Sequence, residues 1–415
     1  MNTTCARDCI PPRQSVRGLS LIELMIALLI ASIVTLAIFA VMSTFEGRKR
    51  TTTSVNDANQ AGNYALHLLD KLVRSAGSGY VQAGPPPNAD NTDRVAFAFG
   101  CRLLVANGAT TVLPRGSALP EPFENVDTGT AGALRLAPII VAPSQSHGTG
   151  FNGDRSDVLL VMAGAAGFGE VPLTLSGPIA ANNMPVVSAV SIAPGDLLLL
   201  ADQPTPADVE DCMVQQVSST FATAPIGLTG AYAPTSVAGV SRAIYDDKSL
   251  AIKLGHPTNN PPNFMAIGVG DNSTLMSYDL LQARSPALQA MADSVYELHA
   301  VYGVDSDDDG SVNSWVDPRT TTGAFAVTTL MNGTAVSAER IAQIKAIRVA
   351  LILRSNLQEK EPAASEPQFT PATLTLFQSV GLDRTRNLTA GERRFRYRVI
   401  EATIPVRNAL LAPSF

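Results

Sequence analysis

The chain is poor in the residue types that carry catalysis. Its 415 residues include four histidines, one tryptophan and four cysteines, and only 16% are charged. The four histidines have no ligand spacing, and no G-x-S-x-G, H-E-x-x-H or Walker A motif occurs. The formal net charge of −6 gives no reason to expect general nucleic-acid binding. These absences argue against an enzyme, and we predict a non-enzymatic protein with no certain cofactor.

One long stretch lacks charge almost completely. No charged residue occurs between Glu23 and Glu46. The 24 residues from Leu19 to Met42 would form about 36 Å of helix, and roughly 20 apolar residues cross a bilayer. An ionised side chain inside lipid costs on the order of 3 kcal/mol or more, so Glu23 is expected to have a partner. The alternative is an ordinary signal anchor in which this glutamate is incidental.

The helix is expected to continue beyond the apolar run. Small and apolar residues recur there at three- and four-residue spacing, which gives one apolar stripe: Val55, Ala58, Gly62, Ala65, Leu69, Leu72 and Ala76. Gly77-Ser78-Gly79 then predicts the end of the helix. We expect one helix over about residues 19–76, with Gly47 and residues 51–53 as points where it could bend.

After Gly79 the pattern changes to short strands between turns. Strands are expected at residues 94–99, 133–141, 157–162, 196–200, 213–217, 295–301, 347–354 and 394–404, with a short helix from Ser337, its N-cap, to Ile344. The fold class is therefore α+β, a long N-terminal helix packed against a largely antiparallel, β-rich head. The expected domains are a leader (1–18), a membrane-spanning and polymerising helix (19–42), its amphipathic continuation (43–79) and a head (80–415) long enough for two lobes.

The first residues of the apolar run carry a recognisable signal. Residues 17–23, Arg-Gly-Leu-Ser-Leu-Ile-Glu, closely resemble the class III signal of type IV prepilins. The resemblance implies that prepilin peptidase cleaves between Gly18 and Leu19 and methylates the new amino terminus of Leu19, where most major pilins have Phe. It also implies that Glu23 pairs with the terminal amine of a neighbouring subunit, so that each buried charge neutralises the other.

Two further stretches of the sequence indicate a subfamily within the type IV prepilins. Residues 62–77 and 398–408 resemble PilW-type minor pilins of the type IV pilus. That family implies a subunit that primes or takes part in pilus assembly at or near the tip. Its partners would be other minor pilins, the major pilin and a tip adhesin. It would be anchored in the bacterial inner membrane by a single span, with its head in the periplasm, before assembly into a surface pilus. The alternatives are a minor pseudopilin of a type II secretion tip complex and an anchored adhesive or ligand-binding head that never polymerises.

The four cysteines divide between the leader and the head. Cys5 and Cys9 lie in the segment that the prepilin resemblance implies is removed, which leaves Cys101 and Cys212 in the head. An oxidising periplasm would favour a disulfide between these two. Two separate buried thiols remain the alternative, because the sequence does not show that they meet.

One acidic loop has the spacing of a calcium site. Asp305, Asp307 and Asp309 alternate before Gly310, and Asn313 stands at the ninth position, as in a Ca²⁺ loop. The carbonyl of Ser311 would add an oxygen. The twelfth position is Val316 where an EF-hand has Glu, so Asp317, one residue later, would have to serve. A solvated acidic turn is the equally weighted alternative.

Overall fold

The computed structural model describes residues 18, 20–80, 98–126, 133–148, 150–165, 172–202, 211–320, 323–360 and 370–410. The chain divides into two units, Met1–Thr53 and Ser54–Phe415. Each unit is described by itself.

One helix, α1 (Leu21–Ser75), begins in the first unit and ends in the second. It is continuous through Gly47 and residues 51–53, so neither expected weak point interrupts it. In the second unit α1 buries a stripe at three- and four-residue spacing: Ala58, Gly62, Ala65, Leu69 and Val73. The helix ends before Gly77 and Gly79, which have φ of 79° and 89°, a backbone conformation that glycine adopts readily.

The head is built from three larger sheets. The four-stranded sheet has the order β17-β16-β18-β21, with β16 (Val295–Val304), β17 (Ser314–Val316), β18 (Ile344–Arg354) and β21 (Tyr397–Pro405). The five-stranded sheet has the order β15-β14-β13-β4-β3, with β3 (Ile139–Ala142), β4 (Val158–Ala163), β13 (Asn263–Gly270), β14 (Thr274–Asp279) and β15 (Leu288–Ala292). Every pairing in these two sheets is antiparallel.

The six-stranded sheet has the order β2-β1-β8-β7-β12-β5. Its strands are β1 (Arg102–Asn107), β2 (Thr110–Leu113), β5 (Leu173–Thr174), β7 (Leu197–Ala201), β8 (Asp211–Gln216) and β12 (Leu250–Gly255). The β1–β8 pair is parallel. Three two-stranded sheets complete the described strands: β6 (Asn183–Met184) with β9 (Ile226–Gly227), β10 (Ser236–Val237) with β11 (Val240–Ser241), and β19 (Thr373–Leu376) with β20 (Arg384–Asn387).

Three short α-helices accompany the sheets: α2 (Val327–Leu330), α3 (Ala335–Ala342) and α4 (Arg407–Leu410). The expected N-cap at Ser337 is wrong. The side chain of Thr334 caps α3 instead, because its hydroxyl accepts a hydrogen bond from the Ser337 backbone N–H at 3.2 Å. The N-cap therefore lies three residues earlier than the sequence predicted, and the helix ends two residues earlier, at Ala342.

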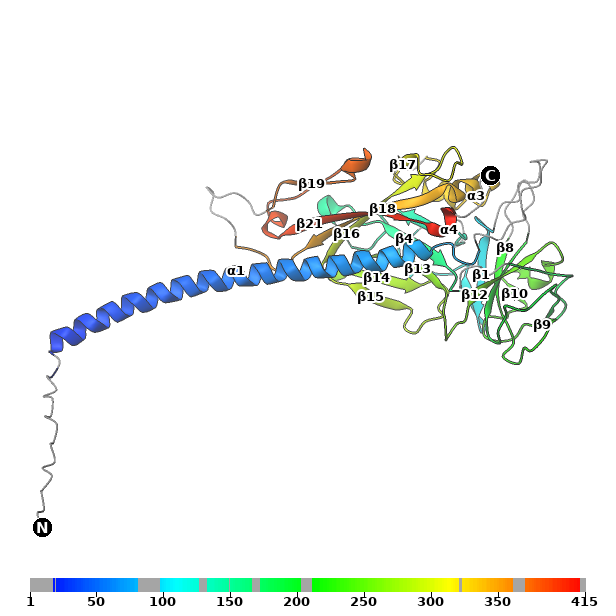
Figure 1. The fold of residues 1–415 in the computed structure, drawn as a ribbon, viewed down its shortest axis with the longest axis horizontal. Coiled ribbons are helices and arrows are strands. Elements are labelled where there is room, and N and C mark those ends of the chain that lie inside the picture. Colours follow the sequence, from blue (N-terminus) through cyan, green and yellow to red (C-terminus); the bar gives the residue numbers. More distant parts are fainter. Residues whose placement is uncertain are drawn as a thin grey trace, which may run out of the picture. The chain divides into compact units, whose positions relative to one another are not determined.

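The main core lies between the C-terminal part of α1 and the sheets. It includes Ala65, Leu69 and Val73 of α1 together with Val349 and Leu351 of β18. Figure 1 shows this part of α1 lying along β18 and β21. The six-stranded sheet is buried on both faces, since alternate residues of β7 belong to the main core and to a second cluster. Both faces are covered, which explains the unbroken apolar run of β7.

The expected α+β class is confirmed: a long apolar N-terminal helix and a β-rich, mainly antiparallel head. Two expected strands differ from the structure. Residues 94–97 lie outside the described residues, and Ala98 and Phe99 belong to a turn. In the segment 133–141 only the part from Ile139 is a strand, while Arg135 forms an isolated bridge to Arg102.

Candidate functional site

The helix begins with a reciprocal pair of hydrogen bonds. The Ser20 backbone N–H donates to Glu23 Oε2 at 3.1 Å, and the Glu23 backbone N–H donates to Ser20 Oγ at 3.3 Å. This is a capping box, which satisfies two backbone donors at the start of a helix. Gly18 is exposed, and Leu19 lies outside the described residues. The capping role of Ser20 was not predicted, although the S-x-x-E spacing of Ser20 and Glu23 is visible in the sequence.

The first half of α1 presents apolar side chains on all sides. By length and composition it could cross a membrane: its most apolar 18-residue window has a mean hydropathy of 2.9, and none of that window is buried. Residues such as Leu21, Leu36 and Phe39 are at least 65% exposed. An apolar surface of this extent needs lipid or other helices to cover it.

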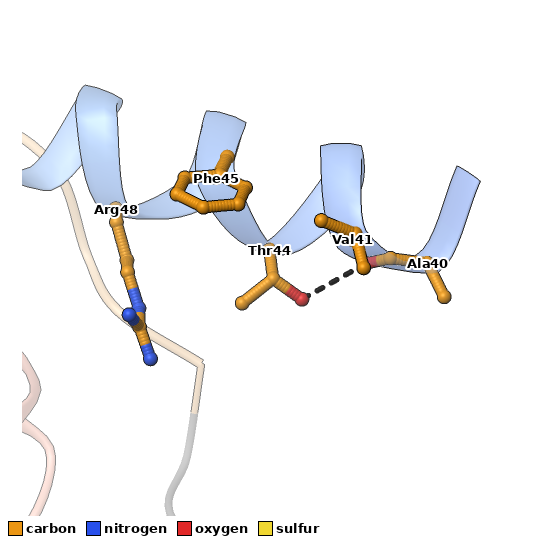
Figure 2. Close-up of a pocket in the computed structure, with 5 residues that line it drawn as sticks. All are labelled: Ala40, Val41, Thr44, Phe45 and Arg48. Atoms are coloured by element: carbon orange, nitrogen blue, oxygen red, sulfur yellow. Dashed lines mark hydrogen bonds between the residues drawn. The ribbon is translucent and has the colours of Figure 1, made fainter. Parts of the chain in front are cut away.

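A shallow hollow lies on this exposed part of the helix. Figure 2 shows its lining residues, all of them on α1: Ala40, Val41, Thr44, Phe45 and Arg48. The Thr44 hydroxyl donates to the backbone carbonyl of Ala40 at 3.0 Å, so its donor is already satisfied. The hollow is therefore an apolar strip with one cation at its end.

The loop after β16 brings three of the predicted calcium ligands together. Carboxylate oxygens of Asp305, Asp307 and Asp309 lie within 4.8 Å of one another. Asn313 belongs to the same loop, because its Nδ2 donates to Asp307 Oδ1 at 2.5 Å. The Ser311 backbone N–H donates to Asp309 Oδ1 at 2.7 Å.

Two of the predicted ligands, Asp305 and Asp317, already have hydrogen-bond partners inside the chain. Asp305 is buried and accepts hydrogen bonds from the backbone N–H groups of Asp309 and Gly310. Asp317 lies outside the group of three, and its Oδ1 accepts from Arg384 Nη2 at 2.9 Å. Calcium binding by this loop stays a prediction, with Asp317 engaged elsewhere.

Cys101 and Cys212 are joined in the structure. Their sulfur atoms are 2.05 Å apart, and 111 residues separate them in sequence. Both are buried, at 3% and 1% exposure. The bond connects the segment just before β1 to β8, which pairs with β1 in parallel.

A buried cluster of charged side chains, which was not predicted from the sequence, joins separate segments of the head. Glu297 and His299 lie on β16, Asp157 directly precedes β4, and Arg384 and Arg386 lie on β20. None of the five is more than 8% exposed. Their sequence spacing gives no signal, because two separate contacts with β16 bring them together: Arg386 of the β19–β20 hairpin binds Glu297, and Asp157 accepts from the Ala300 backbone N–H.

Glu297 is the centre of this cluster. Arg386 donates to both of its carboxylate oxygens at 2.9 Å, and His299 Nε2 lies 2.8 Å from Oε2. Burial alone would raise the pKa of Glu297, but the hydrogen bonds with His299 and Arg386 outweigh burial and hold that pKa below its ordinary value. Burial likewise opposes the charge on Asp157, while His299 and nearby guanidinium groups lower the pKa of that carboxyl strongly. The cluster is sealed from solvent, so its geometry suits holding the hairpin in place rather than reacting with a substrate.

The two stretches that resembled PilW-type pilins contact each other in the second unit. Asn408 Nδ2 donates to the backbone carbonyls of Ser75 and Ala76 at 3.2 and 2.9 Å, which satisfies acceptors at the C-terminal end of α1. Earlier on α1, Gly62 faces Leu353, the β18 residue that pairs with Arg398 of β21. The long helix and the C-terminal strand thus form one packed unit.

Comparison with known families agrees with this architecture at both ends of the chain. Residues 264–408 match the family model described as type IV pilus-assembly protein W. Residues 13–44 match the prokaryotic N-terminal methylation motif. No curated protein and no solved structure matches the chain.

Both matched families are structural, and neither match indicates an enzyme. The methylation motif covers the start of the apolar helix, which supports a membrane-anchored, pilin-related protein. The W-type match covers β13 to α4, and so includes the four-stranded sheet packed on α1. Together these findings support a PilW-type type IV pilin.

Proposed function

We propose that this protein is a minor pilin that primes or takes part in type IV pilus assembly at or near the tip. In this proposal, prepilin peptidase cleaves between Gly18 and Leu19, the Leu19 amine is methylated, and the head lies in the periplasm until the subunit enters a surface filament. Its partners are other minor pilins, the major pilin and a tip adhesin. The observation that carries the proposal is the joint presence of the methylation motif and the W-type region in one chain.

Assembly would proceed by helix packing. The exposed apolar half of α1 leaves lipid and packs against helices of neighbouring subunits. Glu23 then exchanges its partner. In the isolated chain its carboxylate accepts from Ser20, and in the filament it would meet a neighbour's terminal ammonium. A carboxylate and an ammonium pair strongly in a low-dielectric environment, while either one alone is costly there.

The test uses two matched pairs of substitutions. Gly18→Phe should block leader removal, while Gly47→Phe on the exposed part of α1 should leave cleavage intact. Glu23→Ala should lower incorporation into sheared filaments at least tenfold, because a buried ammonium loses its partner. Glu46→Ala removes the next carboxylate of the chain and is expected to leave incorporation unchanged.

Intact-mass measurement of the membrane-bound protein reports cleavage, and quantitative immunoblotting of sheared filaments reports incorporation. Normal cleavage of Gly18→Phe, or filament levels of Glu23→Ala equal to those of Glu46→Ala, would contradict the proposal. A protein that is cleaved but never found in sheared filaments would support an anchored head that does not polymerise. Co-purification with secretion-system components would instead support a pseudopilin.

A further inference from the structure

Three consecutive cations follow the apolar part of α1. Arg48, Lys49 and Arg50 are all exposed and belong to the unit 1–53. In the part of the chain that the structure describes, none of their side chains has an ion pair, including with Glu46 on the same helix. They therefore carry local positive charge in a protein with a formal net charge of −6.

The usual reason for basic residues beside a membrane span does not account for these three. Basic residues commonly mark the cytoplasmic side of a span. Under the proposed function, on which this step rests, the leader with Arg7, Arg13 and Arg17 is removed, and residues 48–50 lie on the periplasmic side. Cations on that side do not orient the span, so another role is needed.

The position of Arg48, Lys49 and Arg50 along α1 matches the expected depth of the lipid headgroup layer. Arg48 lies six residues beyond Met42, which is about 9 Å of helix. The headgroup layer adds roughly 5–8 Å on each side of the hydrocarbon. Lys and Arg side chains can extend back toward that layer while their apolar stems cover the helix.

Their angular spread distinguishes a lipid layer from a single protein partner. Consecutive residues of an α-helix are about 100° apart, so the three side chains cover roughly 200° of its circumference. One face of a neighbouring protein would meet one or two of them. A headgroup layer surrounds the helix and can meet all three.

The hollow in Figure 2 adds an independent observation on the same segment. Ala40, Thr44 and Arg48 are four residues apart and so follow one side of the helix, with Phe45 beside them. The order along the helix is apolar surface first and a guanidinium last. This order matches an acyl chain ending in a phosphate, and a guanidinium suits phosphate geometry.

We propose that Arg48, Lys49 and Arg50 form a basic collar that binds the headgroups of anionic phospholipids while the subunit waits in the membrane. Arg48 contacts a lipid phosphate, and the hollow beside Phe45 receives the upper part of its acyl chain. Entry into a filament then requires these headgroup contacts to be released. Anionic lipid would consequently retard extraction of the subunit from the membrane.

The test is native mass spectrometry of the full chain in detergent micelles that contain equal amounts of phosphatidylglycerol and phosphatidylcholine. The wild type should retain phosphatidylglycerol preferentially, by roughly fivefold for each cation that contacts a headgroup. The triple substitution Arg48→Gln, Lys49→Gln and Arg50→Gln should abolish the preference. Equal retention of both lipids by the wild type, or an unchanged preference in the triple variant, would overturn the proposal.

A matched control removes three exposed cations from the second unit: Lys71→Gln, Lys248→Gln and Arg407→Gln. This variant has the same net charge as the collar variant and should keep the wild-type lipid preference. A loss of preference in the control would show a general charge effect and would contradict a local collar.

The same spectra give the intact mass. A chain that still carries residues 1–18 but shows a collar-dependent preference would contradict the proposed processing and leave the collar supported.

Discussion

Gly62 of α1 packs against Leu353 of β18, and the effect of adding one methyl group at Gly62 should change sign when the Leu353 side chain is removed. A Cβ at Gly62 would lie 2.1 Å from Leu353 Cδ1, 2.7 Å from Cδ2 and 2.9 Å from Cγ. Leu353 is 1% exposed, so its side chain cannot relieve the clash by turning toward solvent. Overpacking of this kind costs about 1–3 kcal/mol, whereas Ala is more favourable than Gly inside a helix by about 1 kcal/mol. Gly62→Ala should therefore lower the free energy of unfolding by up to about 2 kcal/mol.

The sign should reverse when the obstructing side chain is removed. Leu353→Ala alone should cost about 2–5 kcal/mol because it leaves a cavity in the core. In that background the added methyl group of Gly62→Ala enters the cavity, the overpacking cost disappears, and the helix-propensity gain of about 1 kcal/mol remains. The coupling energy between the two substitutions should then be about 1–3 kcal/mol, as expected for residues in contact.

Urea unfolding of the full chain in micelles, followed by the fluorescence of the single tryptophan Trp315, measures these differences. Gly47→Ala is the control, since nothing lies within 4 Å of a Cβ at Gly47. We expect no destabilisation in the control. Additive effects of Gly62→Ala and Leu353→Ala, or a Gly62→Ala variant more stable than the wild type, would refute the packing argument.

Three further predictions concern the head. The pKa of Glu297 is lower in the folded chain than its ordinary value of 4.5, so its charge stabilises the fold above about pH 4.5 and that contribution is lost as pH falls further. Glu297→Gln should lower the free energy of unfolding by about 3–5 kcal/mol at pH 7, as measured by urea unfolding. Between pH 5 and pH 3 this variant should lose less stability than the wild type. An equal loss of stability in both proteins over this pH range would contradict the prediction. Replacing both Cys101 and Cys212 by Ala should lower the free energy of unfolding by about 4–5 kcal/mol in the chain-entropy model, because 111 residues separate the two bonded cysteines. Detection of two free thiols in the native protein would contradict this prediction. Calorimetric titration of the wild type with Ca²⁺ should give a heat of binding. Asp309→Ala should abolish this heat, whereas Asp293→Ala, at an exposed aspartate outside the loop, should retain it. The absence of heat in the wild type would exclude the site.

Local patterns were sufficient to predict the long helix. An uncharged run, a stripe of small residues and a glycine pair predicted a helix over residues 19–76, and α1 covers Leu21–Ser75. Helical periodicity depends on neighbours three and four residues away, so it is visible in the sequence. The N-cap of α3 was missed by the same kind of reasoning, because Thr334 and Ser337 are both suitable caps and only the backbone conformation decides between them.

The sheets were predicted less completely. Strands at the centre of a sheet, such as β4 and β18, contain continuous apolar runs and were recognised with shifted ends. The strand β16 was also recognised, although it contains Glu297 and His299. The hairpin of β19 and β20 was not recognised. Exposed threonines and an asparagine alternate with leucines and buried arginines. A buried arginine has the sequence appearance of a surface residue.

The sequence alone determined the membrane-length helix, its acidic residue near the start, the N-terminal methylation motif and the spacing of the acidic loop, because each depends on residues within a short stretch of the chain. Only the tertiary structure decided that Cys101 meets Cys212, that Arg386 neutralises Glu297, and that Asn408 holds the end of α1. These contacts join residues between 89 and 332 positions apart. Their energy depends on distances of a few ångströms, which the packing of the sheets sets and no local pattern contains.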